Sequence, residues 1–456
     1  MVLFERIVAE GLAHQSYLIG SGTDAAVIDP RRDCEIYCEI ARKNGLTIRH
    51  IFETHRNEDY VVGSLELQER CGAEIWHGAG LPFSYGKPVH EGNRCTVGSL
   101  EIEVLETPGH TEESITLMVR DREVSGEPYL VFCGDTLFAG DIARTDFYGQ
   151  ERKGEMAGKI YDSIVGKILA LGDGVIVCPA HGAGSICGGE IADHPFSTVG
   201  YERQTNSLIR MGREAFIAMR AAESPYTPPY FRQMEQINRV GASPLPRDMF
   251  PKFLTIAEVT AYRNAGCQIV DIRTPAGFSA GHIGGSVSIW RNGLSSFTGW
   301  FLDYEKPIVI VDDFNLGLEL VARQFVRLGY DNLAGVLAGG FPSWTKAGEE
   351  FATLPTCSVH QLKERLKTES PFLLDVRDIK NWRARGHIIG AHHIYVGELM
   401  GRIREIPENI PVVVYCDAGF KGSLAASILA RNTYRAVTNV LGGMTAWTAA
   451  GFLVER

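Results

Sequence analysis

Four residues whose side chains can bind a metal each follow a strand-like run in the first half of the chain. His55 stands in Thr54-His-Arg-Asn-Glu-Asp-Tyr60, and His110 stands in Thr107-Pro-Gly-His-Thr111. Asp135 follows in Phe132-Cys-Gly-Asp-Thr136, and His181 in Cys178-Pro-Ala-His-Gly182. Loops that leave strands commonly present ligands, and imidazole and carboxylate groups bind divalent transition metals. The four motifs therefore predict a metal site built from loops.

Strands and helices must hold these loops in place. The apolar runs 16–20 and 25–29 are separated by Ser-Gly-Thr-Asp, which predicts two strands joined by a turn. Strand-like and helix-like runs then alternate to about residue 235. Residues 241–251 contain three prolines and predict an exposed linker. We therefore expect the first domain to cover residues 1–240.

An internal repeat with a period of roughly one hundred residues follows the linker. Each copy also has a β-branched run, a short loop and an apolar helical stretch, which predicts βα units and a parallel sheet. The matching segments are 269–273 with 373–377, 281–286 with 386–391, 308–311 with 412–415, and 338–344 with 441–447.

The length, the composition and the net charge limit the class of protein to which the chain can belong. A chain of 456 residues with 45% hydrophobic residues is too long for one core. Its formal net charge is -10, and no Lys/Arg cluster alternates with aromatic residues, so nucleic acid is an unexpected partner. Residues 1–10 offer no signal-peptide core, and no uncharged apolar stretch reaches membrane-spanning length. We therefore expect a cytoplasmic protein with no membrane partner, whose ten cysteines, without a CxxC pair, are reduced thiols.

The order and spacing of the four histidine and aspartate motifs resemble the metallo-β-lactamase superfamily, which implies an αββα sandwich. The first motif of that superfamily is normally T-H-x-H-x-D-H, and it supplies ligands for two metals. Here Asn57 replaces the second histidine and Tyr60 replaces the third. Amide and phenol groups are poor substitutes for imidazole, so we do not expect a full dinuclear zinc site.

Within the superfamily the remaining pattern resembles the persulfide dioxygenases, in which the positions of His55, His110 and Asp135 hold one iron. Two imidazoles and a carboxylate leave coordination positions open for a persulfide sulfur and dioxygen. The runs 141–146, 181–188 and 200–203 also resemble that subfamily. The resemblance implies Fe(II), one per chain, with zinc as the alternative.

Four further residues near these motifs have two interpretations each. Asp59 and His181 orient ligands or a bound water, or they only make loop hydrogen bonds. Arg144 holds the substrate's carboxylate, or it forms an ion pair with Asp146. Cys187 faces the metal and handles sulfur, or it is a buried structural thiol.

The repeat resembles the rhodanese domain over residues 252–352 and 356–456. In that fold a cysteine ends a strand and a tight loop leads into a helix, and Cys416 lies at that position. Backbone N–H groups and a helix starting near Ser423 are expected to lower its pKa and to stabilise a persulfide anion. The familiar loop is C-R-x-G-x-R-S. Here Asp417 and Lys421 replace its two arginines, so we expect Lys421 to contact an anionic substrate.

The first copy of the repeat has Asp312 where the cysteine should be. A carboxylate cannot carry sulfane sulfur, so we expect this copy to be catalytically silent and to serve as a scaffold, an interface or a docking surface. The pairs Asp271 with Arg273 and Asp375 with Arg377, together with His282 and His387, are expected to maintain the fold.

Together these features resemble persulfide dioxygenase–sulfurtransferase fusions of bacterial sulfide detoxification. The resemblance implies oxidation of a small thiol persulfide by O2 to sulfite, and transfer of sulfane sulfur from Cys416 to sulfite to give thiosulfate. The thiol carrier stays open among glutathione, coenzyme A and bacillithiol, and so does the oligomeric state, a homo-oligomer included. One alternative is a zinc thioester hydrolase of the hydroxyacylglutathione type fused to a sulfur carrier. Another is a non-enzymatic, metal-bound sulfur sensor or carrier.

Overall fold

A computed structural model describes residues 2–245 and 250–456. The chain divides into two units, one formed by residues 1–247 with 326–329, the other by residues 248–325 with 330–456. The linker predicted at residues 241–251 falls at this division, and its residues 246–249 lie outside the described part. The domain ranges 1–240, 252–352 and 356–456 stay predictions.

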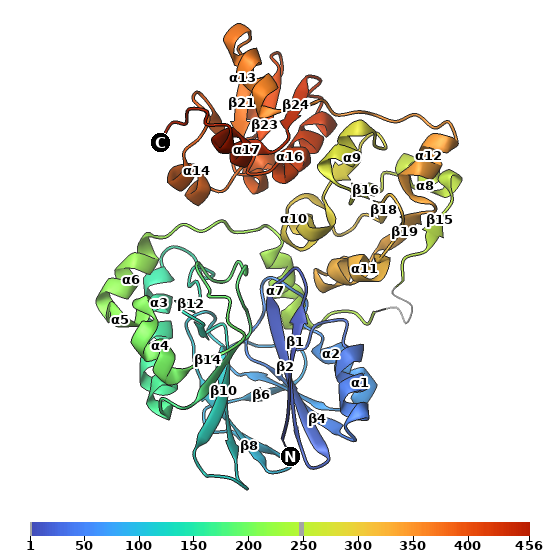
Figure 1. Cartoon of the computed structure of the whole chain (residues 1–456). Coiled ribbons are helices and arrows are strands. Elements are labelled where there is room, and N and C mark those ends of the chain that lie inside the picture. Colours follow the sequence, from blue (N-terminus) through green and yellow to red (C-terminus); the bar gives the residue numbers. More distant parts are fainter. Residues whose placement is uncertain (1, 246–249) are drawn as a thin grey trace. The chain divides into compact units, whose positions relative to one another are not determined.

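Two six-stranded sheets face each other in the first unit (Figure 1). Strands β3, β4, β5 and β6 run parallel, whereas β1 and β2 join them as an antiparallel hairpin. The first sheet, in spatial order, consists of β1 (Val2–Ala9), β2 (His14–Ser21), β3 (Asp24–Ile28), β4 (Thr47–Glu53), β5 (Glu74–Gly78) and β6 (Lys87–Val89). The second consists of β14 (Ser197–Thr198), β13 (Ile176–Pro179), β10 (Pro128–Gly134), β9 (Ile115–Asp121), β8 (Leu100–Glu106) and β7 (Arg94–Val97).

Alternating side chains on the strands build three layers of core. In β2, Tyr17 and Ile19 enter the cluster between the sheets, whereas Leu18 enters the cluster behind the first sheet. In β10, Phe132 faces the space between the sheets, whereas Val131 packs toward the helices behind the second sheet. This period of two is what a strand buried on both faces requires.

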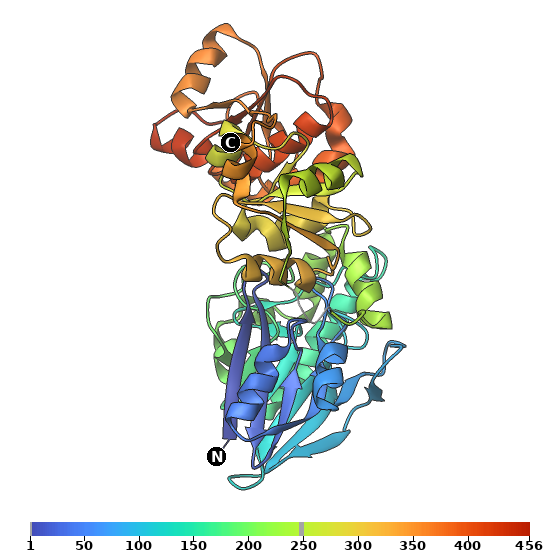
Figure 2. The same cartoon turned by 90° about the vertical axis from the view of Figure 1, so that its right-hand side faces the viewer.

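Helices cover the outer faces of both sheets, so the predicted αββα sandwich is confirmed. Figure 2 shows α1 and α2, drawn in blue, over the first sheet. A short ribbon, β11 (Leu137–Phe138) with β12 (Asp141–Ile142), follows the second sheet's central strand β10. The helices are α1 (Glu35–Lys43), α2 (Ser64–Cys71), α3 (Lys153–Ser163), α4 (Val199–Thr205), α5 (Ser207–Arg210), α6 (Arg213–Ala222) and α7 (Phe231–Val240), with the short turns η1 (Ile164–Ile168) and η2 (Leu169–Leu171) after α3.

The second unit contains two parallel five-stranded sheets with the same strand order, which confirms the rhodanese-like α/β prediction. The corresponding β-branched runs, 308–311 and 412–415, form the buried central strand of each sheet. The first sheet, in spatial order, is β15 (Phe253–Leu254), β19 (Leu333–Leu337), β18 (Ile308–Val311), β16 (Gln268–Asp271) and β17 (Val287–Ser288). The second is β20 (Thr356–Cys357), β24 (Val437–Val440), β23 (Val412–Tyr415), β21 (Phe372–Asp375) and β22 (His392–His393).

The helices of this unit repeat in the same way. Helices α8 and α13 each begin with a capping box, formed by Thr255 with Glu258 and by Ser358 with Gln361. The first copy has α8 (Ile256–Asn264), α9 (Pro275–Ala280), η3 (Arg291–Gly293), α10 (Leu294–Phe301), α11 (Leu318–Arg327) and α12 (Gly340–Lys346). The second has α13 (Val359–Thr368), α14 (Ile379–Arg385), η4 (Val396–Glu398), α15 (Leu399–Arg402), η5 (Ile403–Glu405), α16 (Phe420–Arg431) and α17 (Gly443–Ala449).

The repeated Asp-x-Arg motif is a buried ion pair in both copies. Arg377 Nη2 donates to Asp375 Oδ2 at 2.6 Å and to the carbonyl of Gly386 at 2.8 Å. Arg273 makes the same two contacts, with Asp271 and the carbonyl of Gly281, both at 2.6 Å. The motif ties the end of β16 in the first copy, and of β21 in the second, to the loop that precedes the next strand.

Replacing Arg377 with methionine is expected to destabilise the last domain by about 3–5 kcal/mol, because Asp375 would stay buried without its partner. Both side chains of this pair are fully buried. Calorimetry of the full chain would show one unfolding transition move to lower temperature. The control is Arg365→Met, which removes a partly exposed pair with Glu369 and should change stability by less than about 1 kcal/mol. Equal shifts in the two variants would contradict a fold role for the motif.

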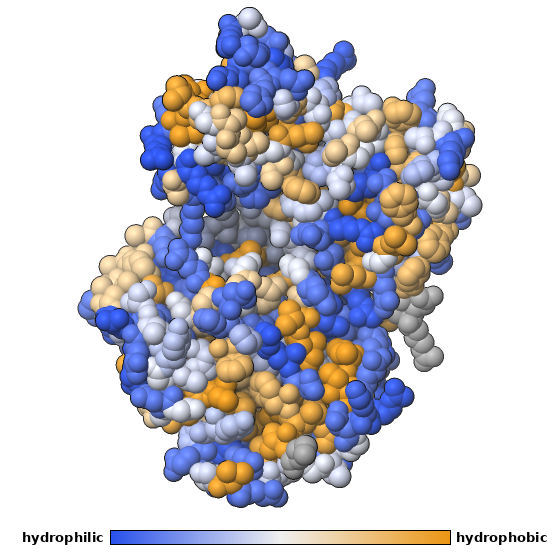
Figure 3. All heavy atoms as spheres, viewed as in Figure 1, coloured by the Kyte–Doolittle hydropathy of each residue, from blue (hydrophilic) through white to orange (hydrophobic). Residues whose placement is uncertain are grey.

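The polarity of the surface and the length of the helices show whether the chain has features of a membrane-spanning protein. The face shown in Figure 3 mixes hydrophilic and apolar residues. Within residues 2–245 and 250–456, no helix has the length and apolar character needed to cross a membrane.

Candidate functional site

The four predicted metal-site residues all lie at ends of strands, as the motifs indicated. His55 follows β4, His110 follows β8, Asp135 follows β10 and His181 follows β13. All four side chains are buried, with at most 2% of their residue surface exposed. The αββα fold therefore brings together loops from both sheets.

A buried hydrogen-bond chain fixes the His55 loop. Both the backbone N–H and the hydroxyl of Thr54 donate to Asp29, each at 2.7 Å. Because the Thr54 hydroxyl donates to Asp29, its oxygen accepts from His55 Nδ1, 3.0 Å away. This leaves the lone pair of His55 on Nε2. Gly134 has φ of +53°, and a Cβ there would strike Thr54 Oγ1, so glycine lets β10 approach this loop.

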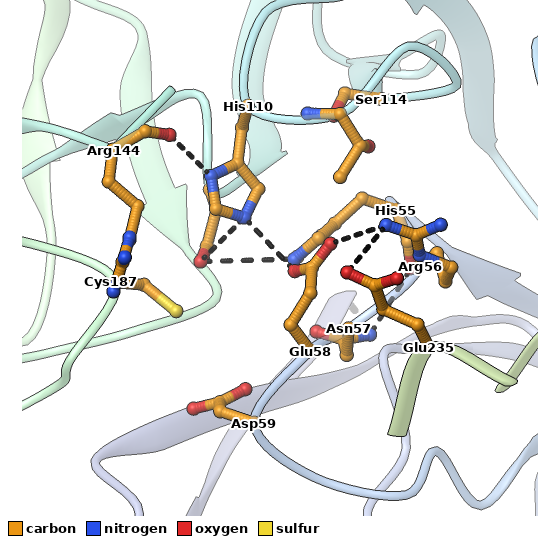
Figure 4. Close-up of polar contacts among 12 residues, drawn as sticks. His55, Arg56, Asn57, Glu58, Asp59, His110, Ser114, Arg144, Cys187 and Glu235 are labelled. Atoms are coloured by element: carbon orange, nitrogen blue, oxygen red, sulfur yellow. Dashed lines mark hydrogen bonds and ion pairs between the residues drawn. The ribbon is translucent and has the colours of Figure 1, made fainter. Parts of the chain in front are cut away.

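His55, His110 and Asp135 converge on one point. Their ligand atoms lie within 4.8 Å of one another. Asp135 Oδ2 is 3.8 Å from His55 Nε2 and 3.5 Å from His110 Nε2. Among the described residues, none of these three atoms has a hydrogen-bond partner. Figure 4 shows the rings of His55 and His110 turned toward the shared point. Three buried atoms that each offer an electron pair and lack a hydrogen-bond partner fit a metal ion.

Contacts behind the triad hold its orientation. His110 Nδ1 donates to the carbonyl of Arg144 at 3.0 Å, so its Nε2 carries the lone pair. His181 Nδ1 lies 2.7 Å from Asp135 Oδ1, which leaves Oδ2 directed at the two imidazoles. Such outer contacts normally set the tautomer and direction of metal ligands. The predicted orienting role of His181 is consistent with this geometry.

The charges of His55 and Asp135 suit a cation. Burial disfavours the charged form of His110, but the carboxylates of Glu58 and Asp135 raise its pKa. Burial lowers the pKa of His55 to about 4, so this imidazole is neutral at pH 7. Burial disfavours ionisation of Asp135, but the imidazoles of His181, His55 and His110 hold the pKa of its carboxyl below the usual range. Neutral imidazole and ionised carboxylate are the ligand forms of these side chains.

Glu58 is a site residue that the motif comparison missed. Its Oε2 lies 3.4 Å from His110 Nε2, and its Oε1 accepts from Arg56 at 3.2 Å. Arg56 also lies 3.3 Å from Glu235. Glu58 lies inside the 54–60 motif at a position where any residue is allowed. Its acidic side chain, next to Asp59, was the feature of the sequence that could have indicated a place in the site.

The positions of the two missing histidines serve other contacts. Asn57 Nδ2 donates to the carbonyl of His55 at 3.2 Å. The ring of Tyr60 stacks on His14, with centroids 3.9 Å apart.

Arg144 is engaged by protein groups. Its guanidinium donates to both oxygens of Asp146 at 2.7 Å and to the carbonyl of Tyr226 at 3.2 Å. The structure thus shows the ion-pair alternative. The predicted role of Arg144 in binding the substrate's carboxylate stays a prediction. Arg144 contacts the triad through its backbone carbonyl, which accepts from His110.

Cys416 directly follows β23, and the loop that begins with it wraps around its sulfur. The N–H of Gly419 donates to Sγ at 3.1 Å, and the thiol is buried. Helix α16 begins at Phe420, not near Ser423 as predicted. The predicted lowering of the pKa is also wrong. Burial raises the pKa of the Cys416 thiol, and the opposing N–H groups of Gly422, Gly419 and Ala418 do not offset it.

A raised pKa predicts the pH dependence of Cys416 alkylation. Less thiolate is present at a given pH than for an ordinary cysteine, which is a few per cent ionised at pH 7. The rate of reaction with iodoacetamide, followed by mass spectrometry of the peptide that contains Cys416, should keep rising beyond about pH 9. A plateau below about pH 8 would show a lowered pKa and contradict this account.

Lys421 faces two carboxylates. Its Nζ lies 3.8 Å from Asp417 Oδ2 and 3.9 Å from Asp378 Oδ2. The lysine side chain is 25% exposed, so it stays accessible to an anion. Its predicted contact with substrate remains a prediction.

The first rhodanese-like copy places a closed ion pair where the second has its cysteine. Asp312 follows β18 as Cys416 follows β23, and its Oδ2 accepts from Arg291 at 2.8 Å and from the N–H of Asn315 at 2.8 Å. The copies also contact each other, because Ser288 Oγ lies 2.9 Å from Ser423 Oγ in helix α16. The first copy therefore supports the helix that follows the Cys416 loop.

Comparisons with known proteins match this architecture. The model of the Metallo-beta-lactamase superfamily matches residues 9–181, and that of the Rhodanese-like domain matches residues 255–347 and 358–450. A crystal structure of a metallo-beta-lactamase from Staphylococcus aureus subsp. aureus COL is 30% identical, with a TM-score of 0.65, over 74% of this chain and 98% of its own.

Two further similarities each cover about half of this chain. A hydroxyacylglutathione hydrolase of Rhodospirillum rubrum is 32% identical over 45% of this chain and 72% of its own length. The crystal structure of ETHE1 from Myxococcus xanthus is 26% identical, with a TM-score of 0.45, over 52% of this chain and 98% of its own. Because the Staphylococcus aureus chain matches over nearly its whole length, the chain belongs to the metallo-beta-lactamase superfamily and carries two rhodanese-like domains behind its first domain.

Proposed function

We propose that the chain oxidises a small thiol persulfide with O2 to sulfite in its first domain and forms thiosulfate through Cys416 in its last. The observation that carries this proposal is the buried triad of His55, His110 and Asp135, whose three free donor atoms share one point. Asn57 and Tyr60 stand where a second metal would need imidazoles. One iron per chain is therefore the cofactor we propose.

At this triad Fe(II) would supply open coordination positions for dioxygen and a persulfide sulfur. The chain's own residues prepare the site. The carbonyl of Arg144 holds His110, Thr54 holds His55, and His181 holds Asp135. Burial excludes bulk water, which otherwise competes for the same positions. In the overall reaction, one persulfide, one O2 and one water give one thiol and one sulfurous acid molecule, ionised as sulfite.

Cys416 provides the second step. Its thiolate attacks the outer sulfur of a second persulfide, and the carrier thiol leaves. Sulfite then attacks the outer sulfur of the Cys416 persulfide, so that thiosulfate forms and the thiolate returns. The Gly419 N–H stabilises the anionic sulfur, and Lys421 offers a cation for sulfite. One chain with both sites raises the effective concentration of sulfite at Cys416.

Glutathione is the carrier that we would test first, because the Rhodospirillum rubrum relative is named a hydroxyacylglutathione hydrolase. Coenzyme A and bacillithiol follow as the other carriers. The cytoplasmic location expected from the sequence is part of the same proposal.

A second candidate is zinc-dependent thioester hydrolysis, favoured by that same similarity. The test compares protein loaded with Fe(II) and protein loaded with Zn(II), each given glutathione persulfide and a hydroxyacylglutathione thioester. The proposal predicts one iron per chain and oxygen uptake only with iron and persulfide. Two zinc ions per chain with rapid thioester hydrolysis and no oxygen uptake would replace it with the hydrolase.

A further inference from the structure

A pocket of about 590 Å³ lies beside the Cys416 loop in the last domain. Pockets that bind small molecules commonly measure roughly 300–1,000 Å³. Its lining includes Arg385 from α14, Met444 from α17, Arg456, and Asp417, which is the residue after Cys416. Figure 1 shows α14 and α17 near the end of the chain marked C. The pocket is therefore large enough for a small thiol and begins next to the proposed nucleophile.

Backbone contacts fix the pocket relative to the Cys416 loop. The N–H of Met444 donates to the carbonyl of Cys416 at 2.7 Å, and the N–H of Thr445 donates to the carbonyl of Asp417 at 2.9 Å. Gly443 has φ of +48°, and a Cβ there would strike the carbonyl oxygen of Cys416, so glycine allows this close approach. A molecule bound against α17 is therefore held at a fixed place beside the sulfur.

Two arginines line the pocket without protein partners. Arg385 ends α14, and Arg456 follows Glu455, whose backbone forms an antiparallel bridge with that of His387. Both hydrogen bonds of this bridge are 2.9 Å long, so the segments that carry the arginines are joined. Both arginines are exposed, and in the described part of the chain neither guanidinium has an ion pair or a hydrogen bond. Two cations are therefore available to an anionic molecule in the pocket.

Asp417 adds one negative charge to the lining. Its side chain is 29% exposed, and its Oδ2 lies 3.8 Å from Lys421 Nζ. The pocket thus presents two guanidinium groups and one carboxylate. Glutathione and bacillithiol each carry two carboxylates and one amino group, which is the complementary set of charges. Coenzyme A carries phosphates and has no amino group that is protonated at pH 7.

We propose that this pocket binds the part of the persulfide carrier that does not react, and that it selects a thiol with two carboxylates and an ammonium group. Arg385 and Arg456 pair with the carboxylates, as guanidinium groups do through two parallel hydrogen bonds. Asp417 accepts from the ammonium group. The inference rests on the sulfur transfer proposed for Cys416 and names the donor of that step. Sulfite is expected to use Lys421, which does not line the pocket.

The test follows thiosulfate formation by the full chain without oxygen, at fixed sulfite and varied glutathione persulfide. Arg385→Gln combined with Arg456→Gln should raise KM for glutathione persulfide by about tenfold and leave kcat within about twofold, because the lost contacts hold substrate and transition state equally. KM for sulfite should not change. The persulfide of 2-mercaptoethanol has no charged group beyond its sulfur and should give the same KM in both proteins.

The matched control is Arg383→Gln, which changes an exposed arginine of α14 that does not line the pocket. It should leave every KM unchanged. Coenzyme A persulfide should have a higher KM than glutathione persulfide in the unmodified chain, and a lower one would overturn the proposed selectivity. The persulfide of bacillithiol, assayed in the same way, distinguishes the two thiols that share the required charges.

A binding measurement separates this inference from the proposed reaction. S-methylglutathione cannot donate sulfur, but it should slow the alkylation of Cys416 by iodoacetamide in the unmodified chain and in Arg383→Gln. The double arginine variant should lose this protection. Thiosulfate formation with an unchanged KM in the double variant, or protection that does not depend on the arginines, would overturn the pocket's role. Protection that depends on the arginines, without thiosulfate from any donor, would support the pocket and overturn only the sulfur transfer.

Discussion

Replacing Asp135 with asparagine should remove iron from the protein and lower oxygen uptake by more than about 100-fold. Asp135 is the only carboxylate of the triad, and its Oδ2 lies within 3.8 Å of both imidazole Nε2 atoms. An amide retains the shape but loses the negative charge and one acceptor. Metal analysis of the purified variant, followed by an oxygen electrode assay with glutathione persulfide, measures both effects.

The control for this variant is Asp162→Asn, which changes an exposed partner of Arg213 in the same domain. It should bind iron and consume oxygen as the unmodified chain does. Transfer of sulfane sulfur to sulfite by Cys416 should continue in Asp135→Asn. An Asp135→Asn protein that keeps one iron per chain and full oxygen uptake would show that the reaction takes place elsewhere.

Replacing Cys416 with serine should reduce thiosulfate formation to the rate of the uncatalysed reaction, while sulfite accumulates. A hydroxyl cannot carry sulfane sulfur, whereas the triad lies in another domain and is not altered. The measurement is the ratio of sulfite to thiosulfate after a fixed uptake of oxygen. Cys357→Ser, which removes another buried thiol of the same domain, should leave this ratio unchanged.

Undiminished thiosulfate formation in Cys416→Ser would contradict the role of this cysteine. It would direct attention to Cys187 as the sulfur carrier. Loss of oxygen uptake in the same variant would show instead that the two reactions cannot be separated.

The amino-acid sequence alone was sufficient to predict the residues that lie at strand ends and the repeated sheets. His55, His110, Asp135 and His181 each follow a strand, and the strand ends of an αββα sandwich meet at one place. The internal repeat predicted two equivalent sheets, and the paired contacts of Arg273 and Arg377 confirm its register.

Features that depend on tertiary packing were not predictable in the same way. The pKa of Cys416 changes in the opposite direction because complete burial outweighs the loop's N–H groups. The contact between Glu58 and His110 joins residues 52 positions apart, counted from 58 to 110. The ligand atoms of Cys187 and Asp59 lie within 4.8 Å of each other although the residues are 128 positions apart, counted from 59 to 187. Spacing along the chain carries no signal for such meetings.

The stoichiometry of the first reaction gives the sharpest test of persulfide oxidation at the triad. Fe(II)-loaded Cys416→Ser protein is given glutathione persulfide in a closed oxygen electrode, and sulfite is quantified as oxygen falls. We expect one O2 to be consumed for each sulfite formed, and we expect the uptake to require iron. Persulfide that disappears without oxygen uptake, or sulfite that forms equally well in the iron-free protein, would contradict this expectation.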